Sequence, residues 1–210
     1  MSLAQDKPLV YLISDGSITD ESYQAKSEKL LRLVKVAVEV RIPLIQVREK
    51  NLSTRHLYDL TLAIVAISKH SQTRILVNDR TDVALCAGAD GVHLTARSIA
   101  AEIVRPFVPN DFLIAVSTHS IGDLEQAVTG RADLAVFAPV FPTPGKGAAT
   151  GLKGLDLAAR SVSGLPVLAL GGVDASNFQD VLKTQAAGFA AIRFLHNTRN
   201  LEKLSLELGL

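Results

Sequence analysis

Short apolar runs alternate along the chain with longer segments whose apolar positions recur every three or four residues. Runs that are apolar throughout are typical of strands buried on both faces of a parallel sheet, whereas the longer spacing is typical of amphipathic helices. The pattern predicts strands at residues 9–13, 43–47, 75–77, 92–94, 113–116, 134–137, 166–170 and 189–192. It predicts helices most clearly at residues 29–40 and 57–68, shorter helices at 82–86 and 177–182, and a closing helix at 201–208.

Eight strand–helix repeats without adjacent hairpin strands predict an α/β fold, a (β/α)8 TIM barrel that forms a single domain over residues 1–210. A doubly wound open sheet is the alternative, but such a sheet would more often have about five or six strands at this length. Segments of the type Gly-Ala-Asp at 87–90 and 130–133 precede the fourth and sixth strands. We interpret them as turns at helix ends.

Composition narrows the class of protein. The chain has 210 residues and a formal net charge of +1, which gives no electrostatic case for a nucleic-acid or membrane partner. No apolar run approaches the ~20 residues that a membrane span needs, and the N-terminus lacks the pattern of a signal peptide. Cys86 is the only cysteine, which excludes an internal disulfide and fits a reducing cytoplasm. Its apolar helical surroundings predict a buried side chain.

The residues that follow the strands carry the candidate chemistry, because parallel α/β folds bind ligands at the carboxyl ends of their strands. The basic ones are Arg48, Lys50, Lys146 and Arg193, and Asp79 is the main acid. Gly171-Gly172 comes directly after the seventh strand and before a helix signal, where backbone N–H groups can approach an anion. These features predict a small phosphorylated ligand.

Several of these residues also have a purely structural interpretation. Arg48 and Lys50 could belong to a solvated loop. Asn78 could cap the next helix, with Asp79 as an acid in its first turn. Lys146 lies in a Pro/Gly loop that is either an exposed tip or a lid.

The two histidines near strand ends differ in what they predict. His93 lies within a strand and is expected to be a hydrogen-bonded residue of the interior. His119 follows a strand and is the better acid–base candidate. It also adjoins a helix start at Ser120, to which it could be incidental.

Six segments together resemble the superfamily of thiamine-phosphate synthase and thiazole tautomerase. The resemblance runs from about Tyr11 to Ile192. The segments, in chain order, are 46–50 (QVREK), 76–80 (LVNDR), 88–94 (GADGVHL), 116–120 (VSTHS), 139–143 (PVFPT) with Lys146, and 170–173 (LGGV).

The resemblance implies an enzyme of thiamine biosynthesis that couples hydroxymethylpyrimidine diphosphate to hydroxyethylthiazole phosphate and releases diphosphate. It implies Mg²⁺ on Asp79 and no nucleic-acid or membrane partner, and it leaves homo-oligomer formation open. The residues that it implies for the pyrimidine diphosphate are Gln46, Arg48, Lys50, Asn78 and Ser117. For the leaving diphosphate and the thiazole phosphate it implies Lys146, Thr143, Gly171 and Gly172.

Three positions depart from the synthase pattern. Ser98 stands where synthases usually have a second magnesium-binding acid, and Gly145 stands where a phosphate-binding threonine is common. Arg193 stands where a small Ser-Ala pair is typical, so it either contacts the phosphate itself or reshapes that pocket by its bulk. These changes bear on the affinity for magnesium and on the coupling reaction.

Two other functions compete with synthesis. In the tautomerase, a histidine at the position of His119 moves protons on a thiazole carboxylate phosphate without a metal. A degenerate barrel that binds a thiamine intermediate for regulation is the alternative without catalysis. The synthase is preferred because Gln46, Lys50 and the pair Asn78-Asp79 keep its pattern.

Overall fold

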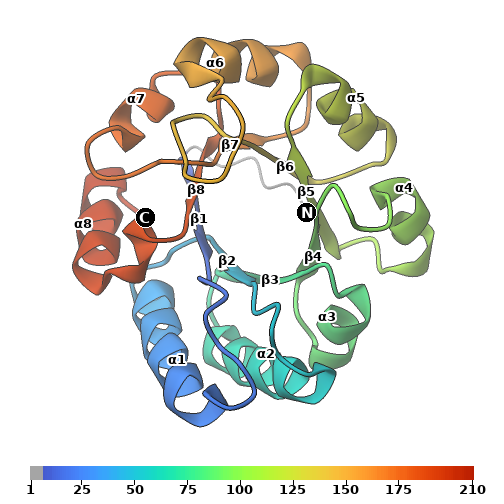
Figure 1. The fold of residues 1–210 in the computed structure, drawn as a ribbon, viewed down its shortest axis with the longest axis vertical. Coiled ribbons are helices and arrows are strands. Elements are labelled where there is room, and N and C mark those ends of the chain that lie inside the picture. Colours follow the sequence, from blue (N-terminus) through green and yellow to red (C-terminus); the bar gives the residue numbers. More distant parts are fainter. Residues whose placement is uncertain (1–6) are drawn as a thin grey trace. The chain divides into compact units, whose positions relative to one another are not determined.

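The eight apolar runs form eight parallel strands that follow one another in chain order in a closed barrel (Figure 1). The predicted TIM barrel is therefore confirmed, and the open sheet is wrong. The computed structural model describes residues 7–210, so the predicted domain start at residue 1 lies outside the described residues. The strands are β1 (Leu9–Ile13), β2 (Leu44–Val47), β3 (Arg74–Asn78), β4 (Gly91–Leu94), β5 (Leu113–Thr118), β6 (Leu134–Phe137), β7 (Val167–Ala169) and β8 (Gly188–Ala191).

Helices alternate with these strands, and two short 3-10 helices complete the pattern. The helices are α1 (Tyr23–Glu39), α2 (Thr54–Ser68), α3 (Thr81–Ala87), α4 (Ala101–Val104), α5 (Ile121–Thr129), α6 (Gly151–Ser161), α7 (Phe178–Leu182) and α8 (Thr198–Leu208). The 3-10 helices are η1 (Arg105–Phe107) and η2 (Phe194–His196). Within the described residues, no helix combines the length and the apolar character that crossing a membrane requires.

The chain divides into two compact units. Unit 1 comprises the chain up to Val10 together with His93–Ala191, and unit 2 comprises Tyr11–Val92 with Ile192–Leu210. In unit 2, β2 pairs in parallel with β3, and α2 packs against both α1 and α3 (Figure 1). In unit 1, β5 to β8 pair in sequence, and β6 and β7 are buried along their whole length. Burial on both faces explains why these strands are apolar throughout.

The two Gly-Ala-Asp segments end helices, as predicted, and each also ties its turn to the preceding strand. Gly88 adopts the left-handed conformation at the C-cap of α3. Asp90 accepts a hydrogen bond of 2.8 Å from the backbone N–H of Ile75. Asp133 accepts one of 2.8 Å from the N–H of Ile114. In each unit, an aspartate side chain thus satisfies the backbone N–H of the second residue of a strand.

Two details differ from the prediction. Cys86 is exposed on α3, because the buried face of this short helix is formed by Val83, Ala84 and Ala87. Strand β5 continues through Thr118, so Ser117 lies in the strand and not after it. The register of β5 explains the extension, since Thr118 still pairs with Phe137 of β6.

Candidate functional site

The carboxyl end of β2 in unit 2 holds three of the five residues predicted for the pyrimidine diphosphate. Gln46 is buried, and its Nε2 donates to the hydroxyl oxygen of Tyr11 at 3.1 Å. Burial raises the pKa of this hydroxyl well above its usual range, so Tyr11 stays neutral. Arg48 is half-buried, and its backbone N–H donates to the hydroxyl of Ser14 at 2.8 Å. Lys50 is exposed at the start of the following loop.

The next polar segment lies at the carboxyl end of β3. Asn78 is the last residue of the strand and is nearly buried, whereas Asp79 is exposed and has a positive φ of 64°. Aspartate tolerates this conformation better than most residues. Arg80 forms a two-point ion pair with Asp82, which holds the pKa of that carboxyl below its usual range.

The capping interpretation of Asn78 and Asp79 is wrong. The N-cap of α3 is Arg80, and the acid in the first turn is Asp82. The amide of Asn78 and the carboxylate of Asp79 therefore have no role in ending or starting this helix. Both stay available to the function that the sequence suggested.

In unit 1, a buried histidine supports the predicted diphosphate contact. His93 is 3% exposed, and its Nε2 lies 2.9 Å from the hydroxyl oxygen of Ser117. This agrees with the prediction of a hydrogen-bonded interior histidine. The pair brings an imidazole of β4 and a hydroxyl of β5 together near their strand ends.

His119 is exposed and oriented by the backbone. Its Nδ1 lies 2.6 Å from the carbonyl oxygen of Ala138. Because a carbonyl only accepts, Nδ1 carries the hydrogen, and in the neutral ring Nε2 is then the basic nitrogen. Helix α5 starts beside it with a capping box between Ser120 and Asp123. His119 is thus adjacent to a helix start and also held in one tautomer.

The loops after β6 and β7 lie directly against each other in unit 1. The backbone N–H of Phe141 donates to the carbonyl of Gly171 at 3.0 Å. A Cβ built on Gly171 would lie 2.9 Å from Pro139, and one built on Gly172 would lie 2.7 Å from Cβ of Phe141. Both glycines also have positive φ, of 96° and 66°. Only glycine allows this approach without displacing the neighbouring loop.

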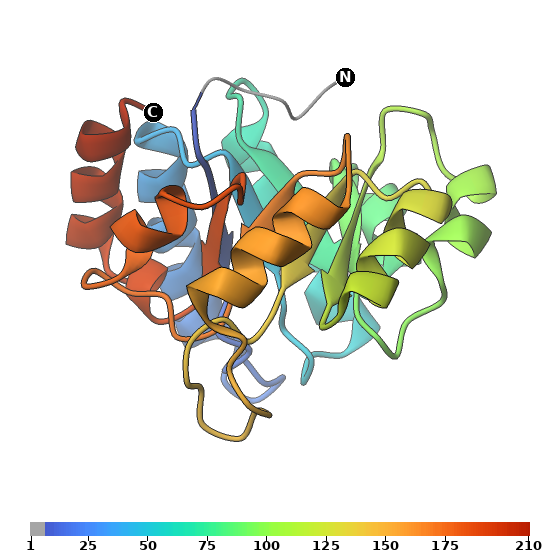
Figure 2. The ribbon, with the colours of Figure 1, turned by 90° about the horizontal axis from the view of Figure 1, so that it is seen from above.

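The same contact brings the predicted thiazole-phosphate residues together. The Thr143 hydroxyl lies 3.1 Å from the Cβ position of Gly171. Lys146 closes a turn with Thr143, its backbone N–H donating to that residue's carbonyl at 3.1 Å. The loop that carries both extends beyond the N-terminal end of α6 (Figure 2). The Lys146 side chain is exposed on it.

Arg193 belongs to unit 2 and comes two residues after the end of β8 along the chain. It is the N-cap of η2, and it is exposed. Two further residues of unit 2 lie close to the predicted set but had no predicted role in it. Glu49 is a nearly buried acid between Arg48 and Lys50, and Ser14 contacts Arg48. A carboxylate between two basic residues at a strand end was the only sequence signal for Glu49.

The segment after β4 does not supply a second acid. The Ser98 hydroxyl accepts a hydrogen bond of 2.7 Å from the backbone N–H of Thr95 and lies 3.1 Å from that residue's hydroxyl. It therefore closes a local turn. Across residues 7–210, no group of three or more His, Cys, Asp or Glu side chains is arranged to bind a metal ion.

The sequence profile of the thiamine monophosphate synthase family matches residues 11–195. The chain belongs to this family. It is 38% identical to a Geobacter sulfurreducens protein provisionally named a thiamine-phosphate synthase, over 87% of this chain and 84% of the relative. It is 35% identical to the thiamine-phosphate synthase of Thermosynechococcus vestitus, over 88% of this chain and 53% of the relative, so it spans about half of that protein.

A solved structure agrees with the family assignment. The thiamine phosphate pyrophosphorylase from Pyrococcus furiosus superposes with a TM-score of 0.77 at 30% identity, covering 95% of this chain and 96% of that one. The resemblance to the thiamine monophosphate synthase family that the sequence indicated is therefore confirmed over most of the chain.

Proposed function

We propose that this protein is a thiamine-phosphate synthase, which couples hydroxymethylpyrimidine diphosphate to hydroxyethylthiazole phosphate. The observation that carries the proposal is the family match over residues 11–195, with relatives named for this activity. A strain that lacks its own synthase tests it. Expression of this chain should restore growth without thiamine, and failure of a well-expressed protein to do so would count against the proposal.

The proposed reaction breaks one C–O bond and forms one C–N bond. Diphosphate leaves the pyrimidine methylene with the bonding electron pair, and the electron-rich ring stabilises the resulting cation. The thiazole nitrogen then donates its lone pair to that carbon. The enzyme's task is to neutralise the charge of the leaving group and to align the two partners.

The described contacts support a role in binding for residues that would hold each of the two substrates. In unit 2, the buried amide of Gln46 suits a polar group of the pyrimidine, and Arg48, Lys50 and Asn78 suit the diphosphate. In unit 1, Thr143 and the adjoining Gly171-Gly172 turn suit the thiazole phosphate. Ser117 and Lys146 would meet the departing diphosphate, and Arg193 would add a further positive charge.

Magnesium fits this chain poorly. The family commonly uses Mg²⁺, and the resemblance would place it on Asp79 and an acid at position 98. The described residues offer Asp79 alone, because position 98 is a serine whose hydroxyl closes a local turn. The chain therefore lacks the second carboxylate that such a magnesium site would use, and no step of the proposed reaction is assigned to a metal.

The response of the rate to Mg²⁺ should change when an acid is placed at position 98. We expect Ser98→Asp to lower the Mg²⁺ concentration for half-maximal activity by about tenfold, because a second carboxylate raises the charge available to the ion. Ser98→Asn, which adds size without charge, is the matched control. A Mg²⁺ titration of the initial rate measures both, and equal curves for the aspartate and asparagine variants would contradict the expectation.

Thiazole isomerisation is the second candidate activity, and the orientation of His119 favours it. With Nδ1 donating to Ala138, Nε2 can take up and return a proton without rearrangement of the ring. Under this function, His119→Ala should slow isomerisation of a thiazole carboxylate phosphate by about a hundredfold or more, and EDTA should have no effect. His70→Ala, an exposed histidine after α2, is the control. An unchanged rate of isomerisation in His119→Ala would rule out this role of His119.

A further inference from the structure

The loop that follows β1 is held along its length by the loop that follows β2. At its inner end, the Ser14 hydroxyl accepts from the N–H of Arg48 at 2.8 Å. Further out, Thr19 pairs with Asn51 in an isolated parallel bridge. These contacts lie within unit 2. The β1 loop, residues 14–22, is therefore part of the surroundings of Arg48.

Glu49 provides the central contact of this arrangement. Its side chain is nearly buried, with 3% exposure. Oε1 accepts from the N–H of Gly16 at 3.2 Å, and Oε2 accepts from the N–H of Ile18 at 2.9 Å. A buried carboxylate is costly unless such donors compensate it. Both oxygens thus face the β1 loop, so neither is directed at an anionic ligand, which a carboxylate would repel.

Gly16 also contacts the guanidinium of Arg48. A Cβ built on Gly16 would lie 3.2 Å from Nη1 of Arg48 and 3.2 Å from its carbonyl oxygen. Gly16 also has a positive φ of 76°. The guanidinium of Arg48 therefore packs against the backbone of Gly16, and Glu49 accepts the hydrogen bond of that backbone N–H. A shift of the Gly16 backbone would change the position of the guanidinium.

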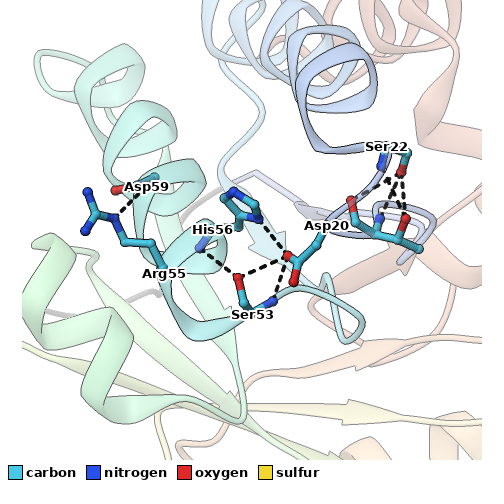
Figure 3. A network of polar contacts seen from close by, with 7 residues as sticks. Asp20, Ser22, Ser53, Arg55, His56 and Asp59 are labelled. Carbon is cyan, nitrogen blue, oxygen red and sulfur yellow. Dashed lines mark hydrogen bonds and ion pairs between the residues drawn. The ribbon is translucent and has the colours of Figure 1, made fainter.

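The outer end of the β1 loop has a separate anchor. Asp20 accepts from both the N–H and the hydroxyl of Ser53, at 2.9 and 3.0 Å, and its carboxylate lies 2.7 Å from Nδ1 of His56 (Figure 3). The hydrogen bond from the Ser53 backbone, followed by that of His56, lowers the pKa of Asp20. Tyr23 stacks on His56 with ring centroids 4.1 Å apart. This anchor does not involve Glu49, so the loop should stay attached when Glu49 is altered.

We propose that Glu49 is a positioning residue for diphosphate binding: its carboxylate fixes the backbone at Gly16 and thereby the guanidinium of Arg48. The proposal deepens the proposed function and rests on it for the role of Arg48. It assigns Glu49 no contact with substrate.

Two variants test the arrangement from its two sides. Glu49→Gln keeps the size of the side chain but replaces one acceptor by a donor that faces a backbone N–H. Gly16→Ala leaves Glu49 intact and places a methyl group against Arg48. Glu28→Gln, which removes a charge from the exposed face of α1, is the control. Binding of inorganic diphosphate is measured by calorimetry, and KM is measured for each substrate.

Both variants should weaken inorganic diphosphate binding by about tenfold and raise KM for the pyrimidine diphosphate to a similar extent. KM for the thiazole phosphate should stay within about twofold. In an Arg48→Ala background, Glu49→Gln should cause no further loss of diphosphate binding, because its effect passes through Arg48. Glu28→Gln should bind inorganic diphosphate as the unmodified protein does and show the same KM for each substrate.

Other results would overturn the proposal. An equal rise in KM for both substrates would indicate a general structural defect. Unchanged diphosphate binding in Glu49→Gln would show that the contact between Glu49 and the β1 loop is dispensable. If Glu49→Gln weakened diphosphate binding about tenfold in the Arg48→Ala background as well, Glu49 would have a direct role in binding. Diphosphate binding needs no turnover, so these outcomes judge Glu49 even if the unmodified protein forms no thiamine phosphate. That last result would reject the proposed function instead.

Discussion

Replacing either Arg48 or Lys146 by alanine is expected to lower the rate of thiamine phosphate formation by about a hundredfold or more. Each cation is proposed to bind the diphosphate and to meet the negative charge that grows on it as the C–O bond breaks, so its loss should lower kcat as well as weaken diphosphate binding. Steady-state kinetics with both substrates should therefore show a fall in kcat for each variant.

Two nearby substitutions serve as matched controls. Arg55→Ala removes an exposed guanidinium near the start of α2 that pairs with Asp59, and Lys153→Ala removes an exposed ammonium near the start of α6. Both should retain the rate of the unmodified protein within about twofold. An unmodified rate in Arg48→Ala or in Lys146→Ala would contradict the proposed site.

Gly188→Ala is expected to give the largest loss of stability. Gly188 begins β8 with a φ of 150°, and a Cβ built there would lie 2.0 Å from the carbonyl oxygen of Leu9 and 2.7 Å from its nitrogen. The neighbouring Ala187 carbonyl accepts the N–H of Leu9 at 2.8 Å, so the two segments cannot separate without losing this bond. We expect a loss of about 4 kcal/mol or more, a large share of the stability of a typical domain.

Gly164→Ala separates steric overlap from backbone strain. Gly164 also has a positive φ, of 77°, but a Cβ there would meet no atom within 4 Å. We expect a cost of only about 1 kcal/mol at this position. Urea unfolding measures both variants, and a Gly188→Ala protein as stable as Gly164→Ala would contradict the packing at β8.

The strands were the most predictable part of the fold. The predicted bounds of β1 and β6 match the structure, because each is an apolar run whose residues are all buried. Helix α6 was not predicted, since it begins with Gly151 directly after a Pro/Gly loop and lacks a side-chain cap. The short α4 was also missed, because its four residues are too few to display a helical period.

The candidate site was predictable as residue types at strand ends but not as contacts. The partners of Glu49 lie 31 and 33 residues away along the chain, so its role depends on how two loops meet. Likewise, the tautomer of His119 depends on a carbonyl 19 residues away. Local pattern carries no information about such pairs, which are formed only when the strands are in register.

Formation of thiamine phosphate by the purified protein tests the central claim most directly. The protein is incubated with hydroxymethylpyrimidine diphosphate and hydroxyethylthiazole phosphate, with Mg²⁺ and without it, and both products are quantified. Synthesis predicts thiamine phosphate and diphosphate in equal amounts. Absence of thiamine phosphate under both conditions, from folded protein that binds either substrate, would contradict the account and favour isomerisation or a regulatory role.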